Sequence, residues 1–220
     1  HVGGANTAGP ADALGEIRDI GWDGYNDLNQ FAVPFPYYYR DYERLPDRAT
    51  EHTMYSSTQK LWEYAQKNRK LGAKDDDGVA WDKGWKPWKF ADEAKTSDRG
   101  AAGKISFGFW SKFDADNYSV VWSYDPVTNT YSRSNGGTPH LDKITNKAIK
   151  SKNLVVVFAD ERSANDGYEG GHLLYDIVGS GTGTMFNNGK ATKISWKKPT
   201  EEDMMRFYDN SGVEIMLVRG

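Results

Sequence analysis

The sequence lacks cysteine, has no long hydrophobic run and carries little net charge. The absence of cysteine among its 220 residues excludes disulfides, thiolate metal ligands and a cysteine nucleophile, but leaves the cellular compartment open. No apolar run reaches the ~20 residues that a membrane-spanning helix requires. The net charge of −3 argues against a general nucleic-acid-binding protein, because such proteins usually carry a domain-wide basic excess.

Catalytic and metal-binding motifs are also missing. The sequence contains neither a Gly-x-Ser-x-Gly nucleophile elbow nor a His-Glu-x-x-His zinc helix. The glycine segment 179–183 lacks the Lys-Ser/Thr pair of a phosphate-binding loop, so we interpret it as a strand with a bulge or a sheet corner. We therefore predict no cofactor and no metal, and we expect a protein without catalytic activity.

What is present suffices for one large or two small domains. The hydrophobic content of 38% and aromatic content of 14% allow a chain of this length to bury roughly 70% of its unfolded surface. In residues 1–70 we predict a short helix within residues 10–21 and a longer one over 58–71, capped by Ser57 and ended by Gly72. Residues 73–100 are charged and rich in tryptophan, and we interpret them as a connection pinned by its aromatic rings.

Beyond Gly103 the pattern changes to short strands. Turn sequences at residues 125–129, 188–189 and 210–212 separate runs rich in β-branched and aromatic residues. Connections this short favour antiparallel pairing. The predicted strands are 104–110, 117–125, 130–134, 153–161, 172–179, 191–198 and 213–219. We predict an α+β protein: a helical and irregular N-terminal portion over 1–100, packed on a mostly antiparallel β-rich domain over 101–220.

The order of these segments is similar to that of a known family. Residues 123–158, 175–198 and 212–220 resemble the C-terminal domain of the YerB-like lipoproteins, a bacterial family of unknown function. Residues 1–14 and 37–65 resemble the later part of the family's N-terminal α/β domain, so the resemblance implies that residues 1–100 are the remainder of that α/β domain together with the tryptophan-rich connection. The resemblance implies an extracytoplasmic protein with a lipid-anchored precursor, and it supplies no catalytic residues. It also implies that this chain lacks the family's first half-domain and a last short strand.

One group of basic residues is a candidate binding site. Arg40, Arg44, Arg48 and His52 recur every four residues, so a helix would place their side chains on one face as a strip that attracts anions. Pro46 interrupts such a helix. The alternative is that the neighbouring carboxylates neutralise the arginines in surface ion pairs.

Histidines and acidic residues form two further candidates. Glu51 and His52 are adjacent and therefore face apart in a helix or a strand. His172 and Asp176 share a face of one predicted strand but lie about 13 Å apart at the rise of an extended strand. His140, Asp142 and Glu161 have no spacing that specifies a metal.

Aromatic residues are the last candidates. Trp85 and Trp88 are candidate ligand-binding residues, because flat rings stack on sugars, and the same rings are equally suited to join two domains. The other members of this group are Trp81, Trp110 and Tyr37 to Tyr39.

We expect a cell-envelope module that binds an anionic or glycan polymer or a protein partner. One alternative is a cell-wall hydrolase or transferase that uses acidic residues with His52 or His172 and shares its site with the N-terminal segment that the resemblance implies is missing. Another is an assembly factor that recruits a protein by strand addition at a sheet edge.

Overall fold

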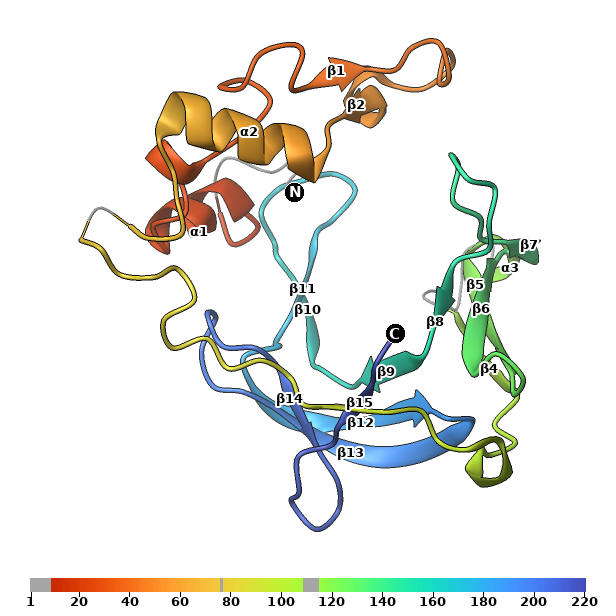
Figure 1. Cartoon of the computed structure of the whole chain (residues 1–220). Coiled ribbons are helices and arrows are strands. Elements are labelled where there is room, and N and C mark those ends of the chain that lie inside the picture. Colours follow the sequence, from red (N-terminus) through yellow and green to blue (C-terminus); the bar gives the residue numbers. More distant parts are fainter. Residues whose placement is uncertain (1–8, 76, 109–114) are drawn as a thin grey trace. The chain divides into compact units, whose positions relative to one another are not determined.

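The computed structural model describes residues 9–75, 77–108 and 115–220 (Figure 1). The chain divides into two compact units. Unit 1 comprises His1–Trp85 and Arg162–Leu174, and unit 2 comprises Lys86–Glu161 and Tyr175–Gly220. The fold class is α+β, as predicted, because unit 1 holds the longer helices and unit 2 is rich in antiparallel strands. The division into domains at residue 100 stays a prediction.

Unit 1 is built from short elements joined by long irregular segments. Its strands β1 and β2 form a two-residue antiparallel ladder that pairs Tyr39 with Tyr55 and Arg40 with Met54. Within the described ranges, no helix has the length and apolar character needed to cross a membrane. The elements of unit 1 up to Trp85 are α1 (Ala13–Asp19), η1 (Gly24–Asn26), β1 (Tyr39–Arg40), η2 (Thr50–Thr53), β2 (Met54–Tyr55) and α2 (Thr58–Arg69).

Both predicted helices are present, with shifted ends. The side chain of Asp12 caps α1 by accepting a hydrogen bond from the Gly15 amide. Ser57 caps α2, as predicted, through a bond from the Lys60 amide. The predicted end at Gly72 is wrong: Lys70 adopts the left-handed conformation, with φ of 54°, and closes the helix two residues earlier.

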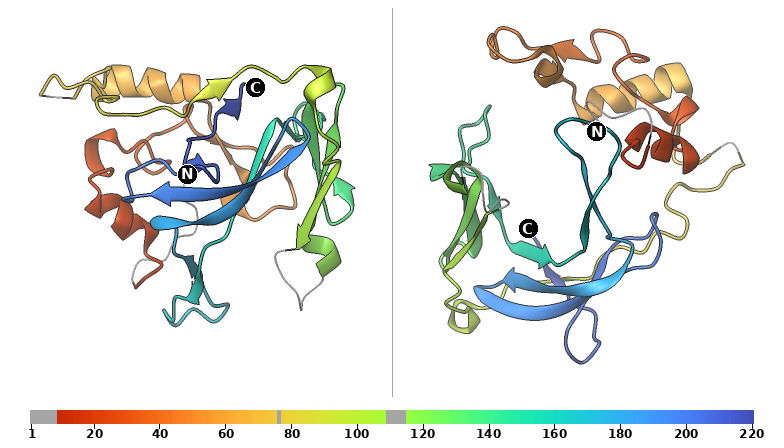
Figure 2. Two further views of the ribbon diagram at one scale, coloured as in Figure 1. Left: turned by 90° about the horizontal axis from the view of Figure 1, so that it is seen from below. Right: turned by 180° about the vertical axis from the view of Figure 1, so that it is seen from behind.

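Unit 2 contains two antiparallel sheets. One has the strand order β4-β5-β6-β7, with β8 also pairing with β6, and the other has the order β14-β13-β12-β9. The long strands β12 and β13 curve together and form nine consecutive residue pairs up to the turn (Figure 2). The strands of the first sheet are β4 (Lys104–Gly108), β5 (Ser119–Asp125), β6 (Thr130–Asn135), β7 (Thr138–Pro139) and β8 (Lys150–Ser151). Those of the second are β9 (Asn153–Val157), β12 (Gly179–Asn187), β13 (Lys190–Lys198) and β14 (Arg206–Tyr208).

The remaining elements include the one departure from antiparallel pairing among the named strands. Strand β3 (Phe90–Ala91) pairs in parallel with β15 (Leu217–Val218). A third, two-stranded sheet joins β10 (Glu161–Ser163) to β11 (Leu173–Tyr175), so the predicted strand over 172–179 is in fact the end of this hairpin and the start of β12. The last two elements are short helices, η3 (Thr96–Asp98) and α3 (Ala115–Tyr118).

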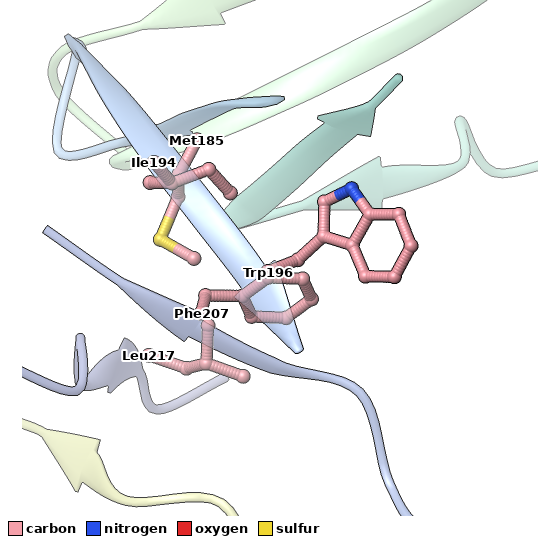
Figure 3. Packing of buried hydrophobic residues seen from close by; sticks show 5 residues of the cluster. All are labelled: Met185, Ile194, Trp196, Phe207 and Leu217. Carbon is pink, nitrogen blue, oxygen red and sulfur yellow. The ribbon is translucent and has the colours of Figure 1, made fainter. Parts of the chain in front are cut away.

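The core of unit 2 lies on one face of the four-stranded sheet (Figure 3). Trp196 is its largest member, and its ring lies over the backbone of Gly181, its cross-strand partner. The ladder between β12 and β13 has no skipped residue across the glycine segment 179–183. Of the two predicted alternatives, a bulge or a sheet corner, the bulge is therefore wrong. At Gly181 the glycine leaves room for the indole, since a Cβ there would lie 2.7 Å from it. The cluster consists of Met185, Ile194, Trp196, Phe207 and Leu217.

Two hairpin turns join the sheets of unit 2. Asn188 and Gly189 connect β12 to β13, as predicted, and the Asn188 side chain accepts a 2.9 Å hydrogen bond from Asn129, which lies in the turn between β5 and β6. Asn129 is fully buried and also accepts a bond from the Tyr124 hydroxyl. The Gly100 amide donates to the Asn188 carbonyl. We call this contact of the two turns the turn joint.

The part of the tryptophan-rich connection that belongs to unit 2, from Lys86 onward, is anchored there. The Trp88 indole donates a 2.9 Å hydrogen bond to the Met205 carbonyl, so this tryptophan anchors the segment within unit 2. Arg206 donates to the carbonyls of Lys86 and Pro87. It also pairs with Glu214 at 2.6 Å, and Lys89 pairs with the same carboxylate at 3.1 Å.

We expect the Glu214 carboxylate to make the stability of unit 2 depend on pH. Hydrogen bonds from Lys89 and then Arg206 hold the pKa of Glu214 below its ordinary value of 4.5. A lowered folded-state pKa stabilises the native state above the ordinary value, and this stabilisation is lost as the pH falls through the folded-state pKa. We expect Glu214→Gln to lower the urea midpoint of unit 2 at pH 7, and the difference from wild type to shrink as the pH falls below 4.5. Exposed Glu202→Gln is the control, and a pH-independent difference would contradict the prediction.

Candidate functional site

The candidate site is an aromatic surface of unit 1, and its first part is the loop over residues 29–37. The Asn29 side chain accepts hydrogen bonds from the amides of Phe31 and Ala32 at 2.8 and 3.1 Å. From α2, the Tyr64 hydroxyl donates to the Ala32 carbonyl and the Lys60 ammonium donates to the Pro36 carbonyl. The loop is therefore held at several points along its backbone.

This held loop presents two phenylalanine rings to solvent. Phe31 is 91% exposed and Phe35 is 79% exposed, whereas Val33 between them is fully buried. The peptide bond between Phe35 and Pro36 is cis. Large apolar rings on an ordered surface contribute little to the stability of the unit, so their position fits contact with a ligand better than folding.

The second part is a tyrosine pair flanked by cations. Tyr39 and Tyr55 face each other across the β1–β2 ladder with ring centroids 6.1 Å apart. The Lys60 ammonium lies 5.3 Å from the centre of the Tyr39 ring, and the Arg44 guanidinium lies 4.8 Å from the centre of the Tyr55 ring. Both distances are within the range of cation–π attraction.

The four basic residues predicted from their spacing do not share a helix. Arg40 lies in β1 and donates to Gln30 and to the Thr50 carbonyl. Arg44 pairs with Asp41 at 2.7 Å. Arg48 and His52 are exposed, the first in a bend and the second in η2. No continuous α-helix aligns the charged groups of these side chains, because turns and a 3-10 helix occupy residues 42–53. Whether any of the four binds a ligand stays a prediction.

Charge is balanced along this part of unit 1. Between residues 37 and 60 the cations Arg40, Arg44, Arg48 and Lys60 are matched by the anions Asp41, Glu43, Asp47 and Glu51. A polyanion would meet as many negative as positive side chains here, because the two kinds of charge are interspersed along residues 40–60. The aromatic rings, rather than the net charge, distinguish this surface.

The predicted tryptophans lie in different places. Trp85 ends the first stretch of unit 1 and is exposed, while Trp88 belongs to unit 2 and is 36% exposed. Trp81 is exposed in unit 1, and Trp110 lies outside the described residues. The indole of Trp88 is already used to bind the Met205 carbonyl.

A carboxylate–imidazole pair lies in the hairpin segment of unit 1, and sequence spacing did not predict it. His172 Nδ1 lies 2.7 Å from Asp166, whose pKa this hydrogen bond lowers, and the Tyr168 ring stacks on the imidazole at 4.2 Å. The pair depends on a turn that brings residues six apart together, which no strand periodicity reveals. In unit 2, His140 is close to Arg133. Among the residues that the structure describes, no three metal-binding side chains gather.

Comparison with known proteins identifies the family. Residues 110–220 match the family model described as the C-terminal domain of a protein of unknown function (DUF3048). This match covers half of the chain, so the chain belongs to that family.

The solved structure of the YerB protein from Bacillus subtilis has a similar fold. The TM-score is 0.63 at 17% sequence identity, over 93% of this chain and 60% of that chain. This confirms the predicted kinship with YerB-like proteins, and the chain spans about 60% of the length of the protein it matches. A comparison with curated proteins gave no match.

Proposed function

We propose that the chain is a non-catalytic binding module of a bacterial cell envelope and that unit 1 binds a glycan polymer. The observation that carries this proposal is the held loop with its two solvent-facing rings, Phe31 and Phe35. A loop whose backbone is already held in place loses little backbone conformational entropy when a ligand stacks on its rings. The resemblance to the YerB-like lipoproteins supports the envelope location.

A glycan fits this surface better than a polyanion. The apolar face of a pyranose stacks on an aromatic ring, and the hydroxyl groups at its edge accept and donate hydrogen bonds. The tyrosine pair of Tyr39 and Tyr55 lies in the hairpin that follows the loop and offers phenolic hydroxyls of this kind. The balanced charge between residues 37 and 60 favours a neutral polymer over teichoic acid.

The double variant Phe31→Ala and Phe35→Ala tests the proposal. We expect it to bind purified peptidoglycan roughly tenfold or more weakly than wild type in a sedimentation assay, because central aromatic residues dominate such contacts. Its stability should stay within about 0.5 kcal/mol of wild type, since both side chains are exposed. Phe158→Ala removes a similarly exposed ring from unit 2 and is the matched control.

Three results would reject the proposal. Wild type that does not sediment with peptidoglycan has no affinity for the proposed polymer. Equal sedimentation of the double variant and wild type would remove the aromatic loop from the site. Sedimentation with teichoic acid alone would show that charge, rather than stacking, determines binding.

A further inference from the structure

Strand β9 is the outermost strand of the four-stranded sheet (Figure 1). Its neighbour β12 pairs with it antiparallel, and the Phe158 amide just after β9 donates to the Thr182 carbonyl at 2.9 Å. Hydrogen-bonded positions alternate along an antiparallel ladder. Leu154 and Val156 therefore bond to β12, whereas Val155 and Val157 direct their amides and carbonyls away from the sheet.

These outward groups form an open edge. In the described part of the chain, no backbone or side-chain group bonds to the amides or carbonyls of Val155 and Val157. The opposite edge of the same sheet is covered, because the returning chain donates from the Ile215 amide to the Phe207 carbonyl at 2.8 Å. In the described part of the chain, such cover reaches only the first residue of β9, Asn153. Its side chain bonds to the amide and the carbonyl of Val218.

The side chains of β9 do not protect this edge. Its five residues, Asn-Leu-Val-Val-Val, are uncharged and end in three β-branched positions. Sheet edges that stay single usually carry a charged residue, a proline or a bulge, and a flat apolar edge pairs readily with another strand. The charges are instead found beyond the two ends: Lys150 and Lys152 precede the strand, and Asp160 and Glu161 follow it.

We propose that β9 pairs antiparallel with β9 of a second copy of this chain. A two-fold axis brings the start of one strand against the end of the other, so the exposed Lys150 of each copy lies near the carboxylates of its partner. Lys152 is already paired with Glu93 of its own chain. A partner strand with the same charge order also offers its own outward groups at Val155 and Val157. The pairing would join two four-stranded sheets into one continuous sheet.

Amide hydrogen exchange on the wild-type chain gives a direct test. The Val155 and Val157 amides should exchange rapidly in dilute protein and become protected as the concentration rises, in parallel with a doubling of mass by light scattering. The Val156 amide, which bonds to β12, should be protected at every concentration. A chain that remains a monomer when concentrated, or that dimerises while Val155 and Val157 still exchange rapidly, would overturn the proposal.

A matched pair of proline variants separates pairing from folding. Val157→Pro removes an outward amide and leaves the ladder with β12 intact, so we expect the dimer to dissociate roughly thirtyfold more readily, since the two-fold axis doubles the loss. Val156→Pro removes an inward amide and should instead destabilise the sheet. A folded Val157→Pro variant that dimerises as tightly as wild type would also overturn the proposal. If the chain binds an unrelated strand-forming peptide at this edge but does not bind a second copy of itself, the edge has a different partner and self-pairing is rejected.

Discussion

Replacing Trp196 with alanine should destabilise unit 2 by about 3–5 kcal/mol. The side chain is 2% exposed and packs with the cluster of Met185, Phe207 and Leu217. Its indole also donates a 3.2 Å hydrogen bond to the Phe158 carbonyl. Truncation would remove the apolar contacts, leave that carbonyl without its donor and uncover Gly181, which has no side chain to fill the cavity.

Urea unfolding followed by tyrosine fluorescence and far-UV circular dichroism would measure this loss. Trp62→Ala is the control, because Trp62 is 62% exposed on α2 and its removal should change stability by about 0.5 kcal/mol or less. A Trp196 variant as stable as the Trp62 variant would contradict the packing described for the four-stranded sheet.

Gly189→Ala should destabilise the turn joint by about 3 kcal/mol or more, because two independent costs add. The residue has a φ of 65°, in the left-handed region that a Cβ disfavours. A Cβ at this position would also lie 2.5 Å from a ring carbon of Tyr124 and collide with the Gly100 carbonyl oxygen. Both neighbours are held by hydrogen bonds, Tyr124 to the Asn129 side chain and Gly100 to the Asn188 carbonyl.

Gly137→Ala isolates the first of these costs. Gly137 has a φ of 76°, and nothing lies within 4 Å of the position that the new methyl group would take, so this variant should lose only the conformational term of about 1 kcal/mol. Thermal unfolding of both variants measures the difference. Equal losses at the two positions would show that the turns of the joint do not touch as closely as described.

Local sequence signals predicted the main turns of unit 2. The Asn188-Gly189 turn, the Asp125 turn and the turn before Gly212 each stand where predicted, because short-range backbone preferences determine such turns. The parallel pairing of β3 with β15 was not predictable in the same way. It joins residues 90–91 to 217–218, and no local pattern in two-residue strands specifies a partner so distant.

The candidate site was predictable only in part. The segment around Tyr37 to Tyr39 was correctly singled out as aromatic, but the most exposed rings are Phe31 and Phe35 beside it. Their exposure depends on Asn29 and on donors from α2, which are tertiary contacts. The helix that would have aligned the arginines is absent for a local reason, since Pro46 and the turns around it prevent a continuous helix.

The turn joint also has a mechanical consequence for unit 2. The hydrogen bond between Asn188 and Asn129 joins the turns of two hairpins. Neither ladder can therefore shift its register by one residue without breaking this bond. A slip would turn Trp196 towards the opposite face of its sheet. Heat should accordingly melt the two sheets in one cooperative step, with equal calorimetric and van't Hoff enthalpies for that transition.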